Sequence, residues 1–320
     1  MNKNSLKGAM LLLIGAFVWG VAFVAQSVGM NHLNAFAFNS IRNFIGAFTL
    51  LPILVWKIYG HKSKMNNVQT LNLGDSLNHS KWSNIFTKDL LIGGIICGTA
   101  LCIASNFQQL GIQYSTVGKS AFITTLYIVF VPILGLFFKK KVSPQVWIGV
   151  FLAMAGLYLL CMKDEAFVLS IGDIYLLLSA FFFTIQITAV DHFAPKVDGV
   201  ALSMMQFFVT AVLSGVCMLF TKIPSWTDIQ AAAIPLLYAG VISCGIGYTL
   251  QIIGQKYLSA TIASLIMSLE SVFATLAGWL LLHEILSTKE LIGCGLVFIA
   301  VILTQLPTIK RKKSLKPHGV

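Results

Sequence analysis

The sequence predicts an all-α integral membrane protein with ten transmembrane helices, arranged as two inverted repeats of five helices each. Three observations lead to this prediction. The chain is 57% hydrophobic and only 10% charged, whereas a soluble domain carries roughly 25% charged residues. It contains ten long apolar runs, and its second half repeats the residue pattern of its first. Such a composition needs a lipid bilayer as its solvent.

Ten runs are long enough to span a bilayer. A spanning helix needs about 20 mostly apolar residues, because each residue adds about 1.5 Å across a core about 30 Å thick. In chain order the runs are 6–27, 34–56, 90–112, 115–138, 144–162, 171–190, 200–220, 232–254, 259–282 and 289–306. The first run is too long for the apolar region of a signal peptide and no convincing cleavage site follows it, so we expect it to remain as a helix.

Lysine and arginine residues gather at alternate ends of these runs. If both termini are cytoplasmic, seventeen of them lie inside and three outside, which is the bias typical of cytoplasmic loops. We therefore expect a multi-pass protein of the plasma membrane with both termini in the cytoplasm, and the lysine- and asparagine-rich loops indicate a bacterial one. The inner group is Lys3, Lys7, Lys57, Lys62, Lys64, Lys81, Lys88, Lys139, Lys140, Lys141, Lys196, Lys256, Lys310, Arg311, Lys312, Lys313 and Lys316, and the outer group is Lys163, Lys222 and Lys289.

An internal repeat divides the chain. A shift of 164 residues places Gly8, Leu12, Ala16, Phe17 and Phe44 on Gly172, Leu176, Ala180, Phe181 and Phe208, and it places Arg42 on Gln206. Shifts of 143 and 144 align Gln108, Gly111, Tyr114, Ser115, Ser120 and Ser143 with Gln251, Gly254, Tyr257, Ser259, Ser264 and Ser287. Five helices are an odd number, so the second unit enters the membrane from the opposite side. Inverted repeats of this kind are an architecture of transporters.

The repeat also predicts the domain boundaries. The first unit covers residues 1–163, including a polar loop at 57–89 that we expect to be cytoplasmic, and the second unit covers 164–306. A basic cytoplasmic tail follows at 307–320. Two complete units make a monomer sufficient, although an oligomer is compatible with the same sequence.

Several motifs resemble the EamA family of the drug/metabolite transporter superfamily. The first half contains Phe17-Val-Trp-Gly-Val-Ala-Phe, Arg42, Gln109-Leu-Gly-Ile-Gln-Tyr-Ser-Thr-Val-Gly-Lys-Ser-Ala-Phe-Ile and Tyr127-Ile-Val-Phe-Val-Pro. The second half contains Ser268-Leu-Glu-Ser-Val-Phe-Ala and Leu280-Leu-Leu-His-Glu. The resemblance covers residues 8–305. The chain departs from the family at Lys139-Lys-Lys, where the first repeat often has an acid; Glu284 keeps that acid in the second.

The resemblance implies transport of small metabolites by alternating access, through a central cavity lined by the first four helices of each repeat. We expect export or exchange of amino acids or related polar or zwitterionic compounds, with drug-like cations as a second class. The expected partners are the solute, the lipid bilayer and either protons or an antiported solute. No enzyme activity and no cofactor are expected.

Three ionisable residues lie at membrane depth, where a charge costs about 3 kcal/mol on insertion scales. We expect Glu270 to be the central anchor, binding an ammonium group or cycling a proton; alternatively it pairs with Arg42 or Lys119 and only holds helices together. For Arg42 a structural role, reaching toward the outer interface, competes with solute binding. Lys119 lies nearer the outer surface, where extension of its side chain to the headgroups explains it equally well.

Polar stripes supply the remaining candidates. Hydroxyls recur at helical spacing at Ser120, Thr124 and Tyr127, and at Ser264, Ser268, Ser271 and Thr275. Amides recur at Asn106, Gln109 and Gln113, and near Tyr248 at Gln251 and Gln255, with Gln186 and Gln206 elsewhere in the second half. Trp19, Phe23 and Gln26 share a face of the first run. Ordinary helix packing is the alternative for all of these residues. The predicted site is Glu270, Arg42, Lys119, Asn106, Gln109, Tyr127, Gln186, Gln206, Tyr248, Gln251, Ser268 and Trp19.

Proline and glycine predict irregular helices at 115–138 and 232–254. Pro132 and Gly135 lie in the first, and Gly245 and Gly247 lie in the second. Proline removes a backbone donor and glycine tolerates bending, so we expect these helices to depart from regular geometry and to contribute to gating.

Other classes of protein fit less well. A membrane-embedded lipid-modifying enzyme needs clustered acids or a His/Asp pair at the interface, and only 11 acidic residues are present. A non-transporting scaffold remains an alternative because of the 57–89 loop. The net charge of +11 comes from segment ends without interleaved aromatics, so nucleic acid is not an expected partner. The six cysteines lack metal-ligand spacing and are predicted to pack within helices.

Overall fold

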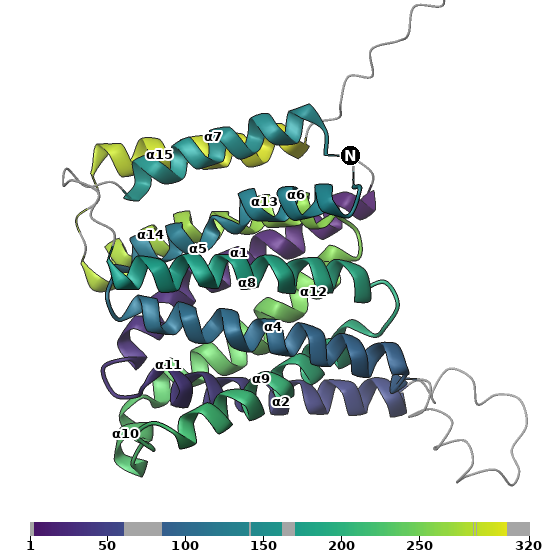
Figure 1. The fold of residues 1–320 in the computed structure, drawn as a ribbon, viewed down its shortest axis with the longest axis vertical. Coiled ribbons are helices and arrows are strands. Elements are labelled where there is room, and N and C mark those ends of the chain that lie inside the picture. Colours follow the sequence, from purple (N-terminus) through teal and green to yellow (C-terminus); the bar gives the residue numbers. More distant parts are fainter. Residues whose placement is uncertain are drawn as a thin grey trace, which may run out of the picture.

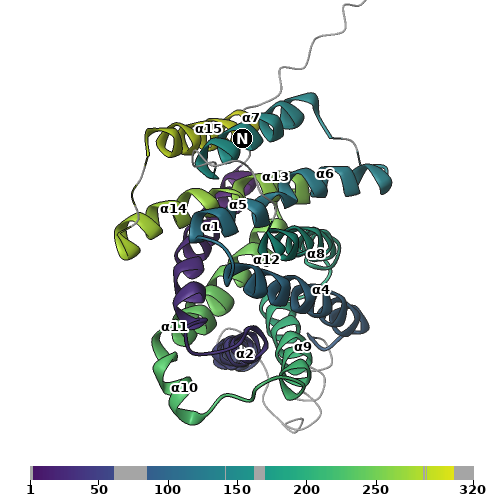
Figure 2. The same ribbon diagram turned by 60° about the vertical axis from the view of Figure 1, so that its left-hand side comes forward.

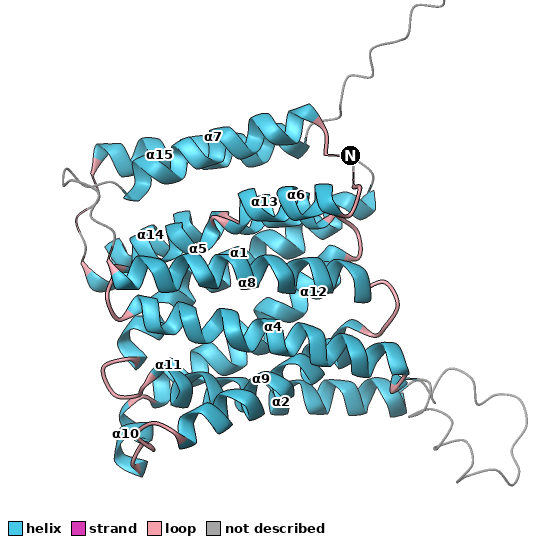
Figure 3. Cartoon of the chain, viewed as in Figure 1, coloured by secondary structure: helices cyan, strands magenta, loops and turns pink. Residues whose placement is uncertain are grey.

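The structure, a computed structural model, describes residues 3–60, 85–140, 142–161, 170–283, 285 and 287–305. Most of the 57–89 loop, the predicted boundary at 163/164, Glu284 and the 307–320 tail lie outside these ranges. Within them the chain is nearly all helical and contains no strand (Figure 3). The helices are α1 (Lys3–Gly29), α2 (Ala35–Gly60), α4 (Lys88–Ile112), α5 (Val117–Thr125), α6 (Tyr127–Phe137), α7 (Pro144–Cys161), α8 (Ile171–Phe193), α9 (Gly199–Leu219), α10 (Trp226–Ala231), α11 (Ala233–Leu237), η2 (Tyr238–Tyr248), α12 (Thr249–Gln255), α13 (Ala260–Met267), α14 (Leu269–Leu282) and α15 (Thr288–Gln305).

The ten predicted runs all correspond to helices or to consecutive helices. Eight segments of the described chain are long and apolar enough to cross a membrane. They are Lys3–Gly29, Ala35–Tyr59, Lys88–Ile112, Val117–Phe137, Ile171–Phe193, Gly199–Leu219, Ala233–Gln255 and Ala260–Leu282. The two remaining predicted runs, 144–162 and 289–306, correspond to α7, a shorter apolar helix, and to α15, and these two helices pack along each other. The predicted all-α membrane fold is therefore confirmed.

The helices lie roughly parallel in stacked layers (Figure 1). In Figures 1 and 2, α7 and α15 form the uppermost layer, and α2 and α9 lie at the bottom. The side on which α1 begins and α2, α6, α8 and α12 end, at the right of Figure 1, carries Lys7, Lys57, Lys140, Lys196 and Lys256. We call this side the lysine-rich end.

Two of the predicted transmembrane spans are each divided into two consecutive helices. The 115–138 segment breaks into α5 and α6 at Leu126, and the 259–282 segment breaks into α13 and α14 at Ser268. At each break a hydroxyl donates to a carbonyl three residues earlier: Thr125 Oγ1 to Phe122 O at 2.8 Å, and Ser268 Oγ to Leu265 O at 2.7 Å. Such bonds compete with the helical ladder. The first break agrees with the predicted irregularity, and the second was not predicted.

The 232–254 segment is irregular in another way. Its central part, η2, is a π-helix of 11 residues that contains Gly240, Gly245 and Gly247. A π-helix is wider than an α-helix and is uncommon at this length. The predicted irregularity of this segment is therefore confirmed, and its helical faces are rotated relative to those of a regular α-helix.

Two close helix contacts have equivalent positions in the two halves. A Cβ atom on Gly8 would lie 2.9 Å from Tyr257 Cβ and 3.0 Å from Gly254 O, where α1 meets α12. A Cβ atom on Gly172 would lie 2.6 Å from Tyr114 Cβ and 3.2 Å from Gly111 O, where α8 meets α4. All three residues of the first contact are matched by the repeat to those of the second. The absence of a side chain at Gly8 and at Gly172 thus allows equivalent pairs of helices to approach closely in each half.

The outer surface is apolar over much of its area. Phe48 is 66% exposed, Phe151 71% and Ile234 82%. A continuous surface of such side chains is unfavourable in water and is compatible with contact with lipid. Cys217 on α9 is also exposed, so the prediction that all cysteines are packed is wrong at this position.

Candidate functional site

A cavity lies at the middle of the protein, where seven transmembrane segments converge. Its volume is about 30 Å³, which is room for about two water molecules, so a larger ligand enters only when the lining helices move apart. The divided helices α5/α6 and α13/α14 and the π-helix all contribute to its wall. Its lining residues are Trp19, Ala22, Phe23, Gln26, Arg42, Gln108, Thr124, Tyr127, Phe183, Gln186, Ile187, Ser243, Tyr248, Gln251, Met267 and Glu270.

Glu270 provides the carboxyl group of the cavity. It lies in the first turn of α14, directly after the break at Ser268, and is only 5% exposed. Its Oε1 accepts a hydrogen bond of 2.9 Å from the Tyr127 hydroxyl, which begins α6 after the other break. The two helix breaks therefore place this pair at the same depth in the cavity wall.

Arg42 provides the positive charge. It comes from α2, is 3% exposed, and its Nη1 donates to Gln26 Oε1 at 2.9 Å. The guanidinium also lies 5.7 Å from the centroid of the Phe38 ring, a favourable cation–π distance. Its Nε is buried and has no hydrogen-bond partner in the structure. Arg42 is thus held by neutral neighbours and presents an unused donor.

Within the described residues, no ion pair is found for either central ionisable group. Ion pairs are found instead at Lys57–Asp198, Lys119–Asp173 and Lys140–Asp191. The alternative in which Glu270 pairs with Arg42 or Lys119 is therefore wrong. Lys119 is occupied elsewhere because α5 and α8 begin side by side, which brings its Nζ within 2.8 Å of Asp173. Arg42 reaches Gln26 instead.

A chain of amides continues from the cavity into the protein. Gln251 Nε2 donates to Gln186 Oε1, and Gln186 Nε2 donates to Gln206 Oε1, each at 3.3 Å. All three side chains are at most 1% exposed. Gln251 Oε1, which belongs to a lining residue, has no partner and remains available as an acceptor.

An aromatic wall completes the cavity. The rings of Trp19 and Tyr248 have centroids 4.7 Å apart, and Phe207 packs on Tyr248 from behind at 5.7 Å. Trp19 Nε1 is buried without a partner, as is Thr124 Oγ1 on α5. Buried polar groups are normally paired, so unpaired groups on one cavity wall indicate a ligand-binding surface.

Seven predicted site residues line this cavity: Glu270, Arg42, Tyr127, Gln186, Tyr248, Gln251 and Trp19. Five do not. Lys119 pairs with Asp173, Ser268 Oγ bonds to Leu265 O, and Gln206 lies behind Gln186. Asn106 Nδ2 donates to Cys102 O and Ser214 Oγ at 2.8 Å, and Gln109 Nε2 donates to Gln26 O at 3.1 Å. All of these contacts except the Ser268 bond and the Asn106–Cys102 bond join neighbouring helices.

Several lining residues were missing from the predicted site. Gln108 is the clearest case, because the repeat aligns it with Gln251, which also lines the cavity. Gln26 and Thr124 belonged to the predicted polar stripes. Ser243 and Phe183 follow no pattern that distinguishes them from packing residues.

A second cavity of about 250 Å³ lies at the lysine-rich end. Its wall contains Ser143, Thr188 and Thr261 together with Lys140. Lys140 Nζ is 2.5 Å from Asp191 Oδ2, so the cation of this wall is already paired. Among the described residues, no group of three or more His, Cys, Asp or Glu side chains could hold a metal ion in either cavity.

Comparisons with known proteins agree with this architecture. The sequence model of the EamA-like transporter family matches the chain twice, at residues 6–162 and 170–306. An uncharacterized transporter of Archaeoglobus fulgidus is 29% identical over 297 residues, which cover 92% of this chain and 84% of that protein. The uncharacterized transporter YoaV of Bacillus subtilis is 22% identical over 92% of this chain and 95% of its own. A crystal structure matches 93% of this chain and 96% of its own with a TM-score of 0.70 at 15% identity, which shows the shared fold.

Proposed function

The chain belongs to the EamA-like transporter family, and we propose that its solute is a small zwitterion, such as an amino acid, held between Arg42 and Glu270. A single observation carries this proposal. One cavity contains one buried guanidinium group and one buried carboxyl group, and neither belongs to an ion pair among the described residues. A solute with a charge of each sign would complement both.

The energetic argument favours a ligand with two charges. An uncompensated buried charge costs several kcal/mol, and structures retain it where a function requires it. A purely cationic solute would pair with Glu270 but would lie in the same cavity as Arg42. A purely anionic solute would meet the opposite conflict. A zwitterion offsets both costs at once.

The unpaired atoms of the wall give the solute an orientation. Its anionic group would accept hydrogen bonds from Arg42 Nε and Trp19 Nε1. Its ammonium group would bind the Glu270 carboxylate and Gln251 Oε1, next to the ring of Tyr248. Cation–π attraction to an aromatic face contributes about 0.5–2 kcal/mol. The remaining apolar wall, including Phe23 and Phe183, would contact the solute side chain.

The proposed mechanism is alternating access, used for export or exchange. The halves are related by an inverted repeat, and Glu270 and Tyr127 follow breaks in two helices that can bend there. Discontinuous helices at a central site are typical of such transporters. When the solute leaves, a proton or the ammonium group of a second solute can take its place on Glu270. We place both termini and the lysine-rich end in the cytoplasm.

Drug-like cations are a second candidate class, favoured by the aromatic pair Trp19–Tyr248 next to Glu270. Arg42 distinguishes the two solute classes, because it attracts the anionic group of a zwitterion but not a cation. Solutes that lack one of the two charges can therefore show which class the protein transports.

The test is counterflow in proteoliposomes with a matched solute series. Leucine, isopentylamine and 4-methylpentanoate share a side chain but carry both charges, only the ammonium or only the carboxylate. We expect saturable uptake of labelled amino acid, with the amine and the acid competing at least about 30-fold less well, since loss of one buried charge pair costs about 2 kcal/mol or more. An amine that competes as well as the amino acid would instead establish a cation transporter.

A further inference from the structure

Helices α2 and α9 begin with related capping residues. Asp198 caps α9, where its Oδ1 accepts from Val200 N at 2.9 Å and from Ala201 N at 3.1 Å. Asn34 caps α2, where its Oδ1 accepts from Ala37 N at 2.9 Å. The repeat shift of 164 residues places Asn34 on Asp198. The two residues therefore cap the N-termini of equivalent helices at opposite ends of the protein.

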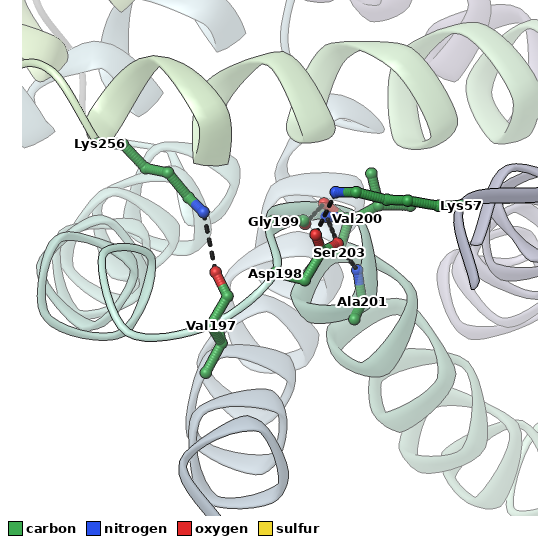
Figure 4. Close-up of polar contacts among 8 residues, drawn as sticks. All are labelled: Lys57, Val197, Asp198, Gly199, Val200, Ala201, Ser203 and Lys256. Carbon is green, nitrogen blue, oxygen red and sulfur yellow. Dashed lines mark hydrogen bonds and ion pairs between the residues drawn. The ribbon is translucent and has the colours of Figure 1, made fainter. Parts of the chain in front are cut away.

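The second polar atom of each capping side chain contacts the chain at the C-terminal end of the other helix. Asp198 Oδ2 pairs with Lys57 Nζ, near the end of α2 (Figure 4). Asn34 Nδ2 donates at 2.6 Å to the carbonyl of Lys222, just beyond α9. Because α2 and α9 run antiparallel along each other, one link closes each end of this helix pair. Both links are formed in the structure.

The two links differ in chemistry and in what they connect. The link at the opposite end is neutral and joins only α2 and α9. At the lysine-rich end, Lys57 and Asp198 form an ion pair, and Lys256 Nζ donates to Val197 O at 2.8 Å (Figure 4). This second bond ties the connection after α12 to the same connection between α8 and α9. Three segments are therefore joined there.

These three segments continue from helices that line the central cavity. Arg42 comes from α2, Gln186 from α8 and Gln251 from α12. By contrast, α9 contributes no residue to the described wall. Holding the ends of α2, α8 and α12 together therefore restrains three lining helices at the lysine-rich end, whereas the opposite link restrains only one lining helix.

We propose that these links are symmetry-related latches for the two faces of the transporter, and that the ionic latch Lys57–Asp198, supported by Lys256, holds the lysine-rich side closed at rest. The inference rests on the alternating access proposed above, but not on the identity of the solute. Opening toward the lysine-rich side requires Lys57 to leave Asp198. Opening toward the other side requires only that Asn34 release one carbonyl.

The test measures access to the cavity from each side. A Ser243→Cys reporter in a background without the six native cysteines is labelled with a membrane-impermeant thiol reagent, in vesicles of both orientations. Ser243 lines the cavity and is not part of either latch. The label needs no solute, so failure of the solute series and failure of the latch give different results.

Asp198→Asn is the informative variant, because asparagine keeps the helix cap while removing the charge. We expect labelling from the lysine-rich side to rise about threefold to fivefold, the range that a partly exposed ion pair can supply. Lys57→Gln should give the same rise, and the double variant should add little more, as for two residues in contact. Asn34→Ala should change labelling from the opposite side by less than about twofold.

Asp89→Asn is the matched control, since Asp89 is an exposed carboxylate in the first turn of α4 at the same end. It should leave labelling unchanged. If Asp198→Asn and Lys57→Gln both leave the labelling rates of folded protein at the wild-type value on both sides, the latch is refuted. An equal rise in Asp89→Asn would also refute it, because the effect would then come from surface charge.

Discussion

The charges at the centre of this protein and those at its ends are partnered in different ways. At the ends, Lys57, Lys119 and Lys140 each reach a carboxylate on another helix. At the centre, Arg42 and Glu270 are more deeply buried, yet each is held only by a neutral side chain. Because burial of an unpaired charge is costly, burial alone would favour ion pairs most strongly at the centre, where the described residues form none. The difference indicates that the ends use their charges to hold helices together, whereas the centre keeps its charges for a ligand.

The largest expected effect tests the central charges. Glu270→Gln and Arg42→Gln should each weaken competition by a zwitterion about 100-fold, since each removes one buried charge pair with the solute. They should do so with opposite selectivity: Glu270→Gln should retain binding of the acid analogue, and Arg42→Gln that of the amine. Competition in counterflow measures both changes.

Glu290→Gln is the matched control for this prediction. Glu290 is also buried, but it accepts from Ser287 N at the start of α15 and does not line the cavity. Its replacement should leave competition unchanged. If Glu270→Gln and Arg42→Gln shifted selectivity in the same direction, the centre would not distinguish the two ends of the solute.

The next effect tests a charge pair at an end. Lys119→Met leaves the Asp173 carboxylate, whose side chain is 1% exposed, without its cation. Because Lys119 itself is 31% exposed, we expect the free energy of unfolding to fall by about 2 kcal/mol, less than for a fully buried pair. Thermal unfolding in detergent measures this loss, and adding D173N should recover part of it. Loss of transport without loss of stability would indicate that Lys119 contributes to solute binding.

A smaller effect tests the neutral partner of Glu270. Tyr127→Phe removes one hydrogen bond to the carboxylate, and we expect solute affinity to fall about fivefold, as for loss of roughly 1 kcal/mol. Tyr238→Phe is the control, because its hydroxyl donates at 3.1 Å to Val18 O outside the cavity. An equal change in both variants would mean that Tyr127 acts on folding and not on Glu270.

The smallest effect concerns pH at the lysine-rich end. Burial alone would raise the pKa of Asp198, but Lys57 and the N–H groups of Ala201 and Val200 outweigh it and hold the pKa below its ordinary value of 3.8. A lowered carboxyl pKa adds stability above its ordinary value, and that stability is lost only as the pH falls through the lowered value. Lys256 is the other charged group facing it, and burial lowers its pKa from the ordinary value of 10.5.

The ratio of reporter labelling in Asp198→Asn to that in the Ser243→Cys background, measured from the lysine-rich side, should therefore stay constant between about pH 5 and 8. The ratio is used because the thiolate fraction of the reporter itself rises with pH. A change of this ratio within that window would mean that a group other than Asp198 controls access from the lysine-rich side.

Much of the architecture could be predicted because it follows from local composition. The spans follow from apolar length, and the two segments predicted to be irregular, 115–138 and 232–254, contain proline or glycine, although the first breaks at Leu126 and not at Pro132. The break at Ser268 was not predicted because serine is common inside membrane helices, and only its bond to Leu265 O shows that it competes with the ladder.

The site was harder to predict, as two neighbouring glutamines illustrate. Gln108 and Gln109 are separated by about 100° around α4, and both are buried. The sequence favoured Gln109 because it shares a stripe with Asn106, but the structure places Gln108 in the cavity and Gln109 against the backbone of α1. A stripe identifies a polar face without identifying what that face meets.

The sequence by itself determined the membrane environment, the helical spans, the repeat and the presence of Arg42 and Glu270 at membrane depth, since these depend on residue type and spacing. Only the tertiary structure decided which polar residues meet in one cavity and which charges pair. Glu270 and Tyr127 are 143 residues apart, and Lys57 and Asp198 are 141 apart. Their contacts depend on how helices rotate and pack against each other, and local sequence does not specify that rotation.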